Sequence, residues 1–309
     1  MIYYLYLLGA VILMALQFSV NKFYQSKNGS GIMTSLLYTT LSGLATGAIF
    51  FCINDFSLQV TPFSFICAVG IAALCLGYSL LGFKIFSIGN FAVFTMFLML
   101  GGMLLPFLYG LVFLGDAQTL SPLSLICRIA GVLLLIVSMA FPSMGKSDAD
   151  QNHDRKKKVL FIALCLLVFF MNGFVSILSK LHQIEAVYPT TDNNSFVFLT
   201  NTINGMFSAA ALFAMTLIKK EGPKLNAAFK PWMLAAAIIV YALCNGLSYL
   251  LQLLAAASTM PASVQYPMMT GGSIVLTAFA GVVFFKEKPT KRALIGTVLA
   301  FAATFLFLF

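Results

Sequence analysis

The chain has 309 residues, of which 61% are hydrophobic and only 9% are charged. Soluble globular proteins carry roughly 25% charged residues, so this composition excludes a water-soluble fold. The net charge of +9 does not indicate a nucleic-acid partner, because the basic residues lie in short clusters between apolar segments and not along one face.

Apolar segments of about 20 residues recur along the whole chain, and each is long enough to cross a hydrocarbon core of about 30 Å. The predicted fold class is therefore an all-α polytopic membrane protein with ten transmembrane helices in a lipid bilayer. We expect these helices at residues 3–22, 31–53, 62–83, 90–114, 122–142, 158–179, 195–218, 231–256, 262–285 and 290–309.

One long hydrophilic segment, residues 143–157, interrupts this pattern near the middle of the chain. Its polar and charged composition is typical of a flexible linker. The linker separates a first five-helix half at residues 1–142 from a second at residues 158–309.

The two halves repeat one another. Residues 73–81 match residues 242–250 at six of nine positions, and Gly43 and Lys22 in other predicted helices correspond to Gly205 and Lys180. Because each half has an odd number of spans, the two halves must cross the membrane in opposite directions. This is the inverted-topology repeat of secondary transporters, whose substrate site lies near the middle of the bilayer between the halves.

Neutral polar side chains on the predicted helices of the second half are the candidate substrate site. On residues 231–256 they stand at i, i+4, i+7 and i+11, which is one face of an α-helix. A carboxamide is costly to bury without a partner, so bound water and substrate would satisfy it. The alternative is that these groups join helices, at about 0.6 kcal/mol per hydrogen bond. The candidate substrate-binding residues are Asn201, Asn204, Tyr241, Asn245, Ser248, Tyr249, Gln252, Gln265 and Tyr266.

Helix-weakening residues and isolated cations form two smaller sets. Proline and paired glycines free backbone groups inside a helix, so they are candidate hinges of the transport cycle. Lysines at helix ends either contact an anion or extend to the lipid headgroups, and an arginine inside a span is harder to explain without an anionic partner. The candidate hinges are Pro267, Gly271, Gly272, Gly101 and Gly102, and the candidate anion contacts are Lys22, Lys180 and Arg128.

Titratable groups are missing from the predicted spans. All nine acidic residues and both histidines lie in loops or at helix ends, which disfavours proton coupling through a buried side chain. The six cysteines show no metal-binding spacing. The sequence has no HExxH motif and no glycine-rich phosphate loop, and its spans hold no paired aspartates and no Ser/His pair. We therefore expect no enzymatic activity, no cofactor and no metal.

The chain resembles the drug/metabolite transporter superfamily, in particular its EamA-like branch of ten-helix proteins. The resemblance rests on the two five-helix halves, on the lysine that closes the first helix of each half, and on residues 285–290 leading into residues 294–298. Residues 114–116 leading into residues 129–132 form a weaker copy. The usual Gly-Glu pair is Lys286-Glu287 in the second half and Gly115-Asp116 in the first.

The resemblance and the polar faces together predict a secondary transporter that works by alternating access. Its expected partner is a small neutral, zwitterionic or amphipathic organic metabolite that is amino-acid-like or nucleobase-like. Two alternatives stay open: a multidrug exporter of hydrophobic compounds, and a non-transporting membrane scaffold or sensor. The expected oligomeric state is a monomer or a homodimer.

The distribution of basic residues predicts the orientation. Loops after odd-numbered spans hold 16 of the 18 Lys and Arg residues. The positive-inside rule assigns these loops to the cytoplasm and leaves both termini outside the plasma membrane. The resembling family is generally described with both termini in the cytoplasm, so the charge count and the resemblance differ here.

Overall fold

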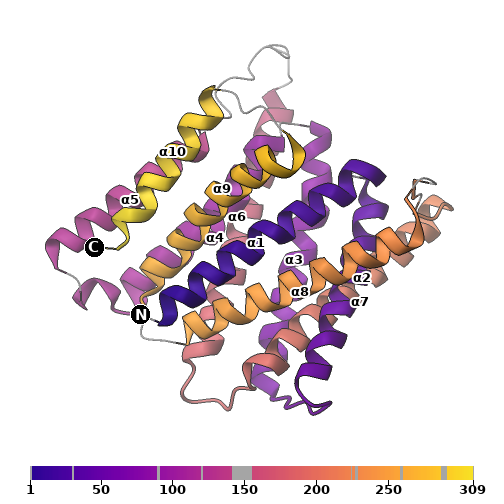
Figure 1. Cartoon of the computed structure of the whole chain (residues 1–309), viewed down its shortest axis with the longest axis horizontal. Coiled ribbons are helices and arrows are strands. Elements are labelled where there is room, and N and C mark those ends of the chain that lie inside the picture. The colour runs from indigo at the N-terminus through magenta and orange to yellow at the C-terminus, as the bar shows by residue number, and fades with distance from the viewer. Residues whose placement is uncertain are drawn as a thin grey trace. The chain divides into compact units, whose positions relative to one another are not determined.

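The structure is a computed structural model that describes residues 2–29, 31–88, 91–119, 121–140, 155–223, 225–226, 229–257, 260–286 and 291–308. Within these residues every regular element is a helix (Figure 1). In chain order the helices are α1 (Ile2–Asn28), α2 (Ile32–Ile53), α3 (Pro62–Ile88), α4 (Phe91–Phe113), the short 3-10 helix η1 (Asp116–Thr119), α5 (Pro122–Ala140), α6 (Arg155–Ile184), α7 (Asn193–Lys219), α8 (Pro231–Ala256), α9 (Ala262–Phe285) and α10 (Lys291–Leu306).

The ten predicted helices are confirmed as the helices α1 to α10, and the chain is a multi-pass membrane protein. Nine of the described helices are long and apolar enough to cross a bilayer. The described part of α10 has 16 residues, or about 24 Å at 1.5 Å per residue, and is apolar from Leu294 to Leu306. Of the predicted linker, residues 143–154 lie outside the described residues, and residues 155–157 already belong to α6.

The chain divides into two compact units. Unit 1 comprises Met1–Leu76 and Leu181–Ala257, and unit 2 comprises Gly77–Lys180 and Ser258–Phe309. Each unit takes helices from both predicted halves, and the long helices α3 and α6 contribute to both units. The compact units therefore differ from the two sequence repeats, whose boundaries stay a prediction.

In unit 1, α1 packs along α8 and α2 packs along α7 (Figure 1). The second pair joins helices that hold the same position in the two halves. Their backbones come close at Gly43 of α2 and Gly205 of α7. A Cβ added at Gly43 would lie 2.8 Å from the carbonyl oxygen of Asn201, so only glycine fits this crossing.

In unit 2, α4 packs on α9 and α5 packs on α10, and these too are pairs of corresponding helices. Helices α3, α4 and α6 share an apolar cluster built on Ile85, Phe94, Cys165 and Val168. The predicted repeat assigns the two helices of each of these pairs to the same position in its two halves, and the repeat itself stays a prediction.

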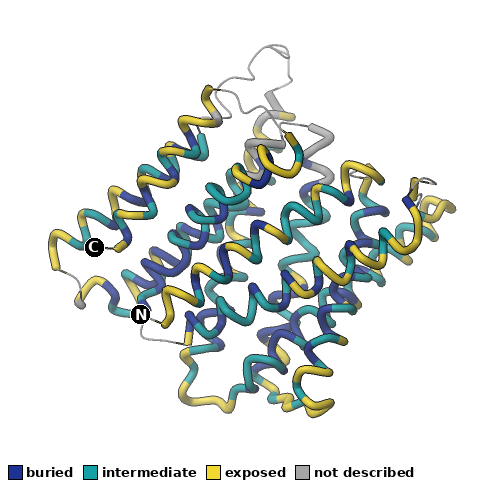
Figure 2. The backbone as a smooth tube through the Cα atoms, in the orientation of Figure 1, coloured by how far each residue is buried: buried dark blue, intermediate teal, exposed yellow. Residues whose placement is uncertain are grey.

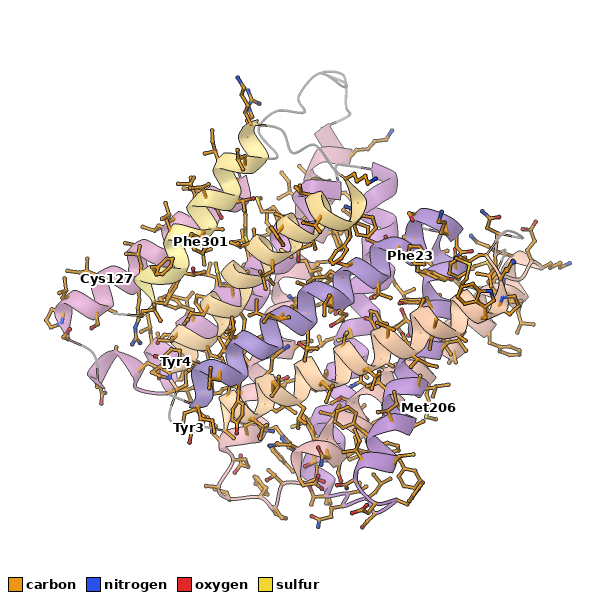
Figure 3. The ribbon with its side chains drawn as sticks, viewed as in Figure 1. Tyr3, Tyr4, Phe23, Cys127, Met206 and Phe301 are labelled. Carbon is orange, nitrogen blue, oxygen red and sulfur yellow. The ribbon has the colours of Figure 1, made fainter. Side chains whose placement is uncertain are left out.

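Exposed positions recur along the helices of both units (Figure 2), and many of them are occupied by large apolar side chains. Leu133 and Phe301 are more than half exposed, on α5 and α10 respectively. Tyr3 and Tyr4 stand at the start of α1 (Figure 3), where tyrosines are favoured at the boundary between membrane and water. In lipid these apolar side chains need no protein partner, so the surface agrees with the composition.

Candidate functional site

A hydrogen-bonded network of neutral side chains joins three helices of unit 1. The amide nitrogen of Gln17 on α1 donates to the hydroxyl of Tyr241 and to Oδ1 of Asn245, each at 3.0 Å. The amide nitrogen of Asn245 donates in turn to Oδ1 of Asn201 on α7 at 2.7 Å. Three predicted substrate-binding residues, Asn201, Tyr241 and Asn245, therefore meet in one network.

The helix periodicity explains how α8 supplies two members of this network. Tyr241 and Asn245 are four residues apart, so both side chains project from the same side of α8 toward α1. Asn201 Nδ2 donates to the carbonyl oxygen of Val197 at 2.9 Å, which holds the asparagine against its own helix. All of these amide side chains are only partly buried.

Aromatic rings line one side of the same region. The ring of Tyr38 on α2 lies edge-on to that of Tyr241, with centroids 5.2 Å apart, and stacks on Tyr24 at 4.2 Å. The ring of Phe229 completes this aromatic cluster and lies edge-on to that of Tyr24, with ring centroids 6.0 Å apart.

Tyr38 differs from the other rings in its hydroxyl group. Only 4% of Tyr38 is exposed, and its hydroxyl has no hydrogen-bond partner among the described residues. By contrast, the Tyr24 hydroxyl donates to the carbonyl oxygen of Thr34 at 3.0 Å. Buried polar groups are almost always paired, so the Tyr38 hydroxyl is available to a ligand or a water molecule.

Two further predicted residues of α8, Ser248 and Gln252, make hydrogen bonds that support helix packing. Ser248 is 1% exposed and donates to the carbonyl oxygen of Ala10 at 2.9 Å, which fastens α8 to α1. Gln252 donates to the Ser248 hydroxyl at 3.1 Å. These bonds support helix packing, so a substrate role of Ser248 and Gln252 stays a prediction.

The remaining predicted substrate residues lie outside this network. Asn204 is half-buried on α7, and the ring of Tyr249 on α8 lies 6.4 Å from that of Phe196. Gln265 and Tyr266 belong to unit 2, where both are buried in α9 and the Tyr266 hydroxyl donates to the carbonyl oxygen of Ser176 at 2.7 Å.

The predicted hinge residues lie in continuous helices. α9 runs through Pro267, Gly271 and Gly272, and α4 runs through Gly101 and Gly102. Three of the glycines allow close packing in unit 2. A Cβ at Gly101 would overlap the carbonyl group of Phe169, a Cβ at Gly102 would lie 2.6 Å from the amide nitrogen of Asn172, and one at Gly271 would lie 2.5 Å from a methyl group of Thr304. A packing role is therefore observed, and the hinge role stays a prediction.

The candidate anion contacts separate clearly by burial. Lys22 is exposed, whereas Lys180, its counterpart in the repeat, is only 4% exposed. Arg128 is also buried and lies close to Asp116, which is 9% exposed although it stands between two helices. The sequence places Asp116 between two predicted helices and gives no sign that it is buried. Its burial comes from the packing against α9, where it accepts a hydrogen bond from Ser263.

Glu185, unlike the buried Asp116, is an acidic residue that is partly exposed. It follows the end of α6, and its Oε1 accepts hydrogen bonds from the backbone N–H groups of Val187 at 2.7 Å and Tyr188 at 3.2 Å. These bonds favour the ionised carboxylate and hold the pKa of Glu185 below its usual value.

Gln17 and Tyr38 were not among the predicted site residues. The sequence offers a reason to predict Gln17 as a site residue, since it is an amide inside an otherwise apolar span. Tyr38 carries no such signal, because a tyrosine in a membrane helix is commonly a packing residue. Within the described residues no group of three metal-ligating side chains comes together. The network itself is made of neutral hydrogen-bonding groups, with aromatic rings beside it.

Comparisons with known proteins agree with this architecture. Residues 159–309 match the model of the EamA-like transporter family. A solved protein structure is similar to this chain with a TM-score of 0.71 and 16% sequence identity, over 98% of this chain and 94% of that one. This similarity shows a shared fold. No curated protein matches the chain.

Proposed function

We propose that the chain, whose residues 159–309 match the EamA-like transporter family, is a secondary transporter of a small neutral or zwitterionic organic metabolite, working by alternating access. The match to this family supports membrane transport of small molecules. The substrate class and the mechanism are our inference, and so is the view that the chain catalyses no reaction.

The observation that carries the proposal is the network of Gln17, Tyr241, Asn245 and Asn201. Its members are three carboxamides and one phenol, which offer both donors and acceptors and no net charge. Such groups complement the amide, amino and carbonyl groups of amino-acid-like or nucleobase-like molecules. A permanently charged drug would gain little from them, because no carboxylate belongs to the network.

The network also suggests how binding couples to movement. Each amide in it is bonded to a side chain on another helix, so a substrate that enters must replace some of these bonds. A substrate that takes the place of the bond between Asn245 and Asn201 would release α8 from α7. Alternating access requires such a difference between substrate-free and substrate-bound contacts.

The test is uptake of radiolabelled amino acids and nucleobases into proteoliposomes, compared between the wild type and Asn245→Ala. We expect the variant to lose at least about fivefold in uptake rate, since leaving a hydrogen-bond partner unsatisfied costs about 1–3 kcal/mol. Asn172→Ala is the matched control, because Asn172 donates to the carbonyl oxygen of Leu98 at 2.8 Å and is not part of the network. Equal uptake by wild type and Asn245→Ala would refute the assignment of the site.

We infer further that the protein lies in the plasma membrane with both termini outside. The support is the charge count of 16 basic residues out of 18 in loops after odd-numbered spans. A reporter fused after Phe309 that is active only in the cytoplasm should stay silent, and a reporter active only outside should work. The opposite result would overturn this orientation.

A further inference from the structure

Basic side chains gather at one end of unit 1, where α1 and α7 end and α8 begins. Residues 22–31 and 219–230, which form this end, hold six lysines against one acidic residue, Glu221, and so carry a net charge of +5. We call four exposed residues of this end the lysine patch: Lys27, Lys219, Lys220 and Lys230.

Contacts hold the connection between α7 and α8 against the end of α1. Nδ2 of Asn226 donates to the carbonyl oxygen of Lys27 at 3.1 Å, and the backbone N–H of Asn226 donates to Oδ1 of Asn28 at 3.0 Å. Phe229 is only 7% exposed, and its ring centroid lies 6.1 Å from that of Phe23, which is labelled in Figure 3. The lysine patch is therefore one surface built from three helix ends.

The other acidic residues of unit 1 belong to the opposite end of α7. Asp192 caps the start of α7, and Asp55 follows Asn54, whose Nδ2 donates to the hydroxyl of Ser195 in the first turn. Glu185 precedes the same end, in the connection from α6. α7 has 27 residues, so about 40 Å separate its two ends. The whole of unit 2 has twelve basic and five acidic residues, so it offers no net negative charge to the patch.

Trp232 indicates the level of this end in the bilayer. It is the second residue of α8 and the single tryptophan of the chain, and it is 66% exposed. Tryptophan side chains are favoured at the level of the lipid headgroups. Lys230 lies two residues before Trp232, and the apolar span of α8 follows it. This order of residues brings the lysine patch to the headgroup level.

Helix dipoles account for only part of the patch. Lys27 and Lys219 lie in the last turns of α1 and α7, where the dipole favours a cation. Lys230 is the N-cap residue of α8, where the dipole disfavours a cation, and its side chain makes no capping hydrogen bond. Basic residues directly beside a membrane span attract anionic phospholipids, by about fivefold in affinity for each residue near the headgroups. Anionic headgroups thus suit both the charge of the patch and its level.

We propose that the lysine patch binds the headgroups of anionic phospholipids, with Trp232 at the boundary between headgroups and acyl chains. The partner is a bilayer lipid whose phosphate group leaves it with a net negative charge, such as phosphatidylglycerol. This interaction goes beyond the transport proposal and does not rest on it, because the patch lies at the end of the spans and shares no residue with the polar network.

The experiment uses Trp232 as an intrinsic probe, since it is the single tryptophan of the full chain. The protein is reconstituted into phosphatidylcholine vesicles that contain rising fractions of phosphatidylglycerol brominated on its acyl chains near the headgroup. Brominated phosphatidylcholine gives the reference curve, because bromine quenches a tryptophan that it contacts. Both leaflets have the same composition, so the result does not depend on the orientation of the protein. We expect the lipid site beside Trp232 to prefer phosphatidylglycerol by at least about fivefold, and equal quenching by the two lipids would overturn the proposal.

Variants of the patch test whether its charge causes the preference. Lys219→Gln combined with Lys230→Gln should lower the preference by at least about fivefold. Lys219→Arg combined with Lys230→Arg keeps both charges and should keep the preference, which separates loss of charge from loss of fold. Lys157→Gln is the matched control, since Lys157 is an exposed lysine of unit 2, and it should behave like the wild type. A preference that survives in the double glutamine variant, or that falls as far in Lys157→Gln, would overturn the proposal.

Inorganic phosphate tests a soluble anion as the occupant. Phosphate added to vesicles of phosphatidylcholine alone should leave the emission of Trp232 unchanged. A saturable effect of phosphate, together with equal quenching by the two lipids, would assign the patch to a soluble anion and overturn the proposal. The effect of Asn245→Ala on uptake has no bearing on this result, because quenching reports lipid contact at Trp232 and not transport.

Discussion

Gly43 and Gly205, which hold the same position in the two sequence repeats, face one another where α2 crosses α7. A Cβ added at Gly43 would lie 3.0 Å from the Cα of Gly205, and a Cβ added at Gly205 would lie 3.0 Å from the backbone nitrogen of Leu44. The predicted repeat assigns these two glycines to corresponding positions, and the packing of α2 on α7 brings them together. Asn201 lies at the same crossing. Its backbone carbonyl oxygen is next to Gly43, and its side chain accepts the hydrogen bond from Asn245.

The first prediction concerns this crossing. Gly43→Ala should destabilise the protein by about 1–3 kcal/mol, because the added methyl group meets backbone atoms that cannot move aside. Thermal unfolding in detergent is the measurement. Gly222→Ala is the control, since a Cβ there meets nothing within 4 Å. If Gly43→Ala proves as stable as the control, the close approach of α2 and α7 is wrong.

The second prediction concerns the bond between Gln17 and Asn245. Truncating both to alanine should cost less than the sum of the single changes, with a coupling energy of about 0.5–1.7 kcal/mol for a hydrogen bond inside a membrane. Thermal or denaturant unfolding of the four proteins of the cycle gives this energy. Combining Gln17→Ala with Asn172→Ala should instead give additive effects, because the two side chains belong to different units. Additivity in both cycles would show that the network does not form.

The third prediction concerns the buried hydroxyl of Tyr38. Tyr38→Phe removes a polar atom that has no partner among the described residues, so folding stability should stay the same or rise by about 1 kcal/mol. If substrate uses this hydroxyl, uptake should fall in the same variant. Tyr24→Phe is the matched comparison: it loses the bond to Thr34 and should be less stable by about 1 kcal/mol. A loss of stability in Tyr38→Phe as large as in Tyr24→Phe would mean that both hydroxyls are bonded.

The fourth prediction concerns the start of α7. Asp192 caps this helix, since its Oδ1 accepts from the backbone N–H of Ser195 at 2.9 Å and its Oδ2 accepts from the Ser195 hydroxyl at 2.6 Å. Asp192→Ala should lower stability by about 0.5–2 kcal/mol, whereas Asp192→Asn keeps a cap and should lose much less. Thermal unfolding distinguishes the two. Equal losses in both variants would point to the charge of Asp192 and not to the cap.

Much of the fold follows from the sequence by itself. An apolar segment of about 20 residues has few alternatives in a bilayer, because only a helix satisfies its backbone hydrogen bonds there. Periodicity likewise sufficed to group Tyr241 and Asn245 on one side of α8, since their spacing of four residues is a local property of any helix.

The tertiary structure alone decided which polar groups meet. Gln17 lies more than two hundred residues from Asn245, and only the packing of α1 on α8 brings their side chains together. The same holds for Lys22 and Lys180, which the predicted repeat treats as equivalent and which differ in burial. It also holds for Asp116, which the sequence predicts in a loop and which is buried at the start of η1 beside α9. Helix formation in lipid is governed by local composition, whereas the environment of a side chain depends on neighbours that the local sequence does not specify.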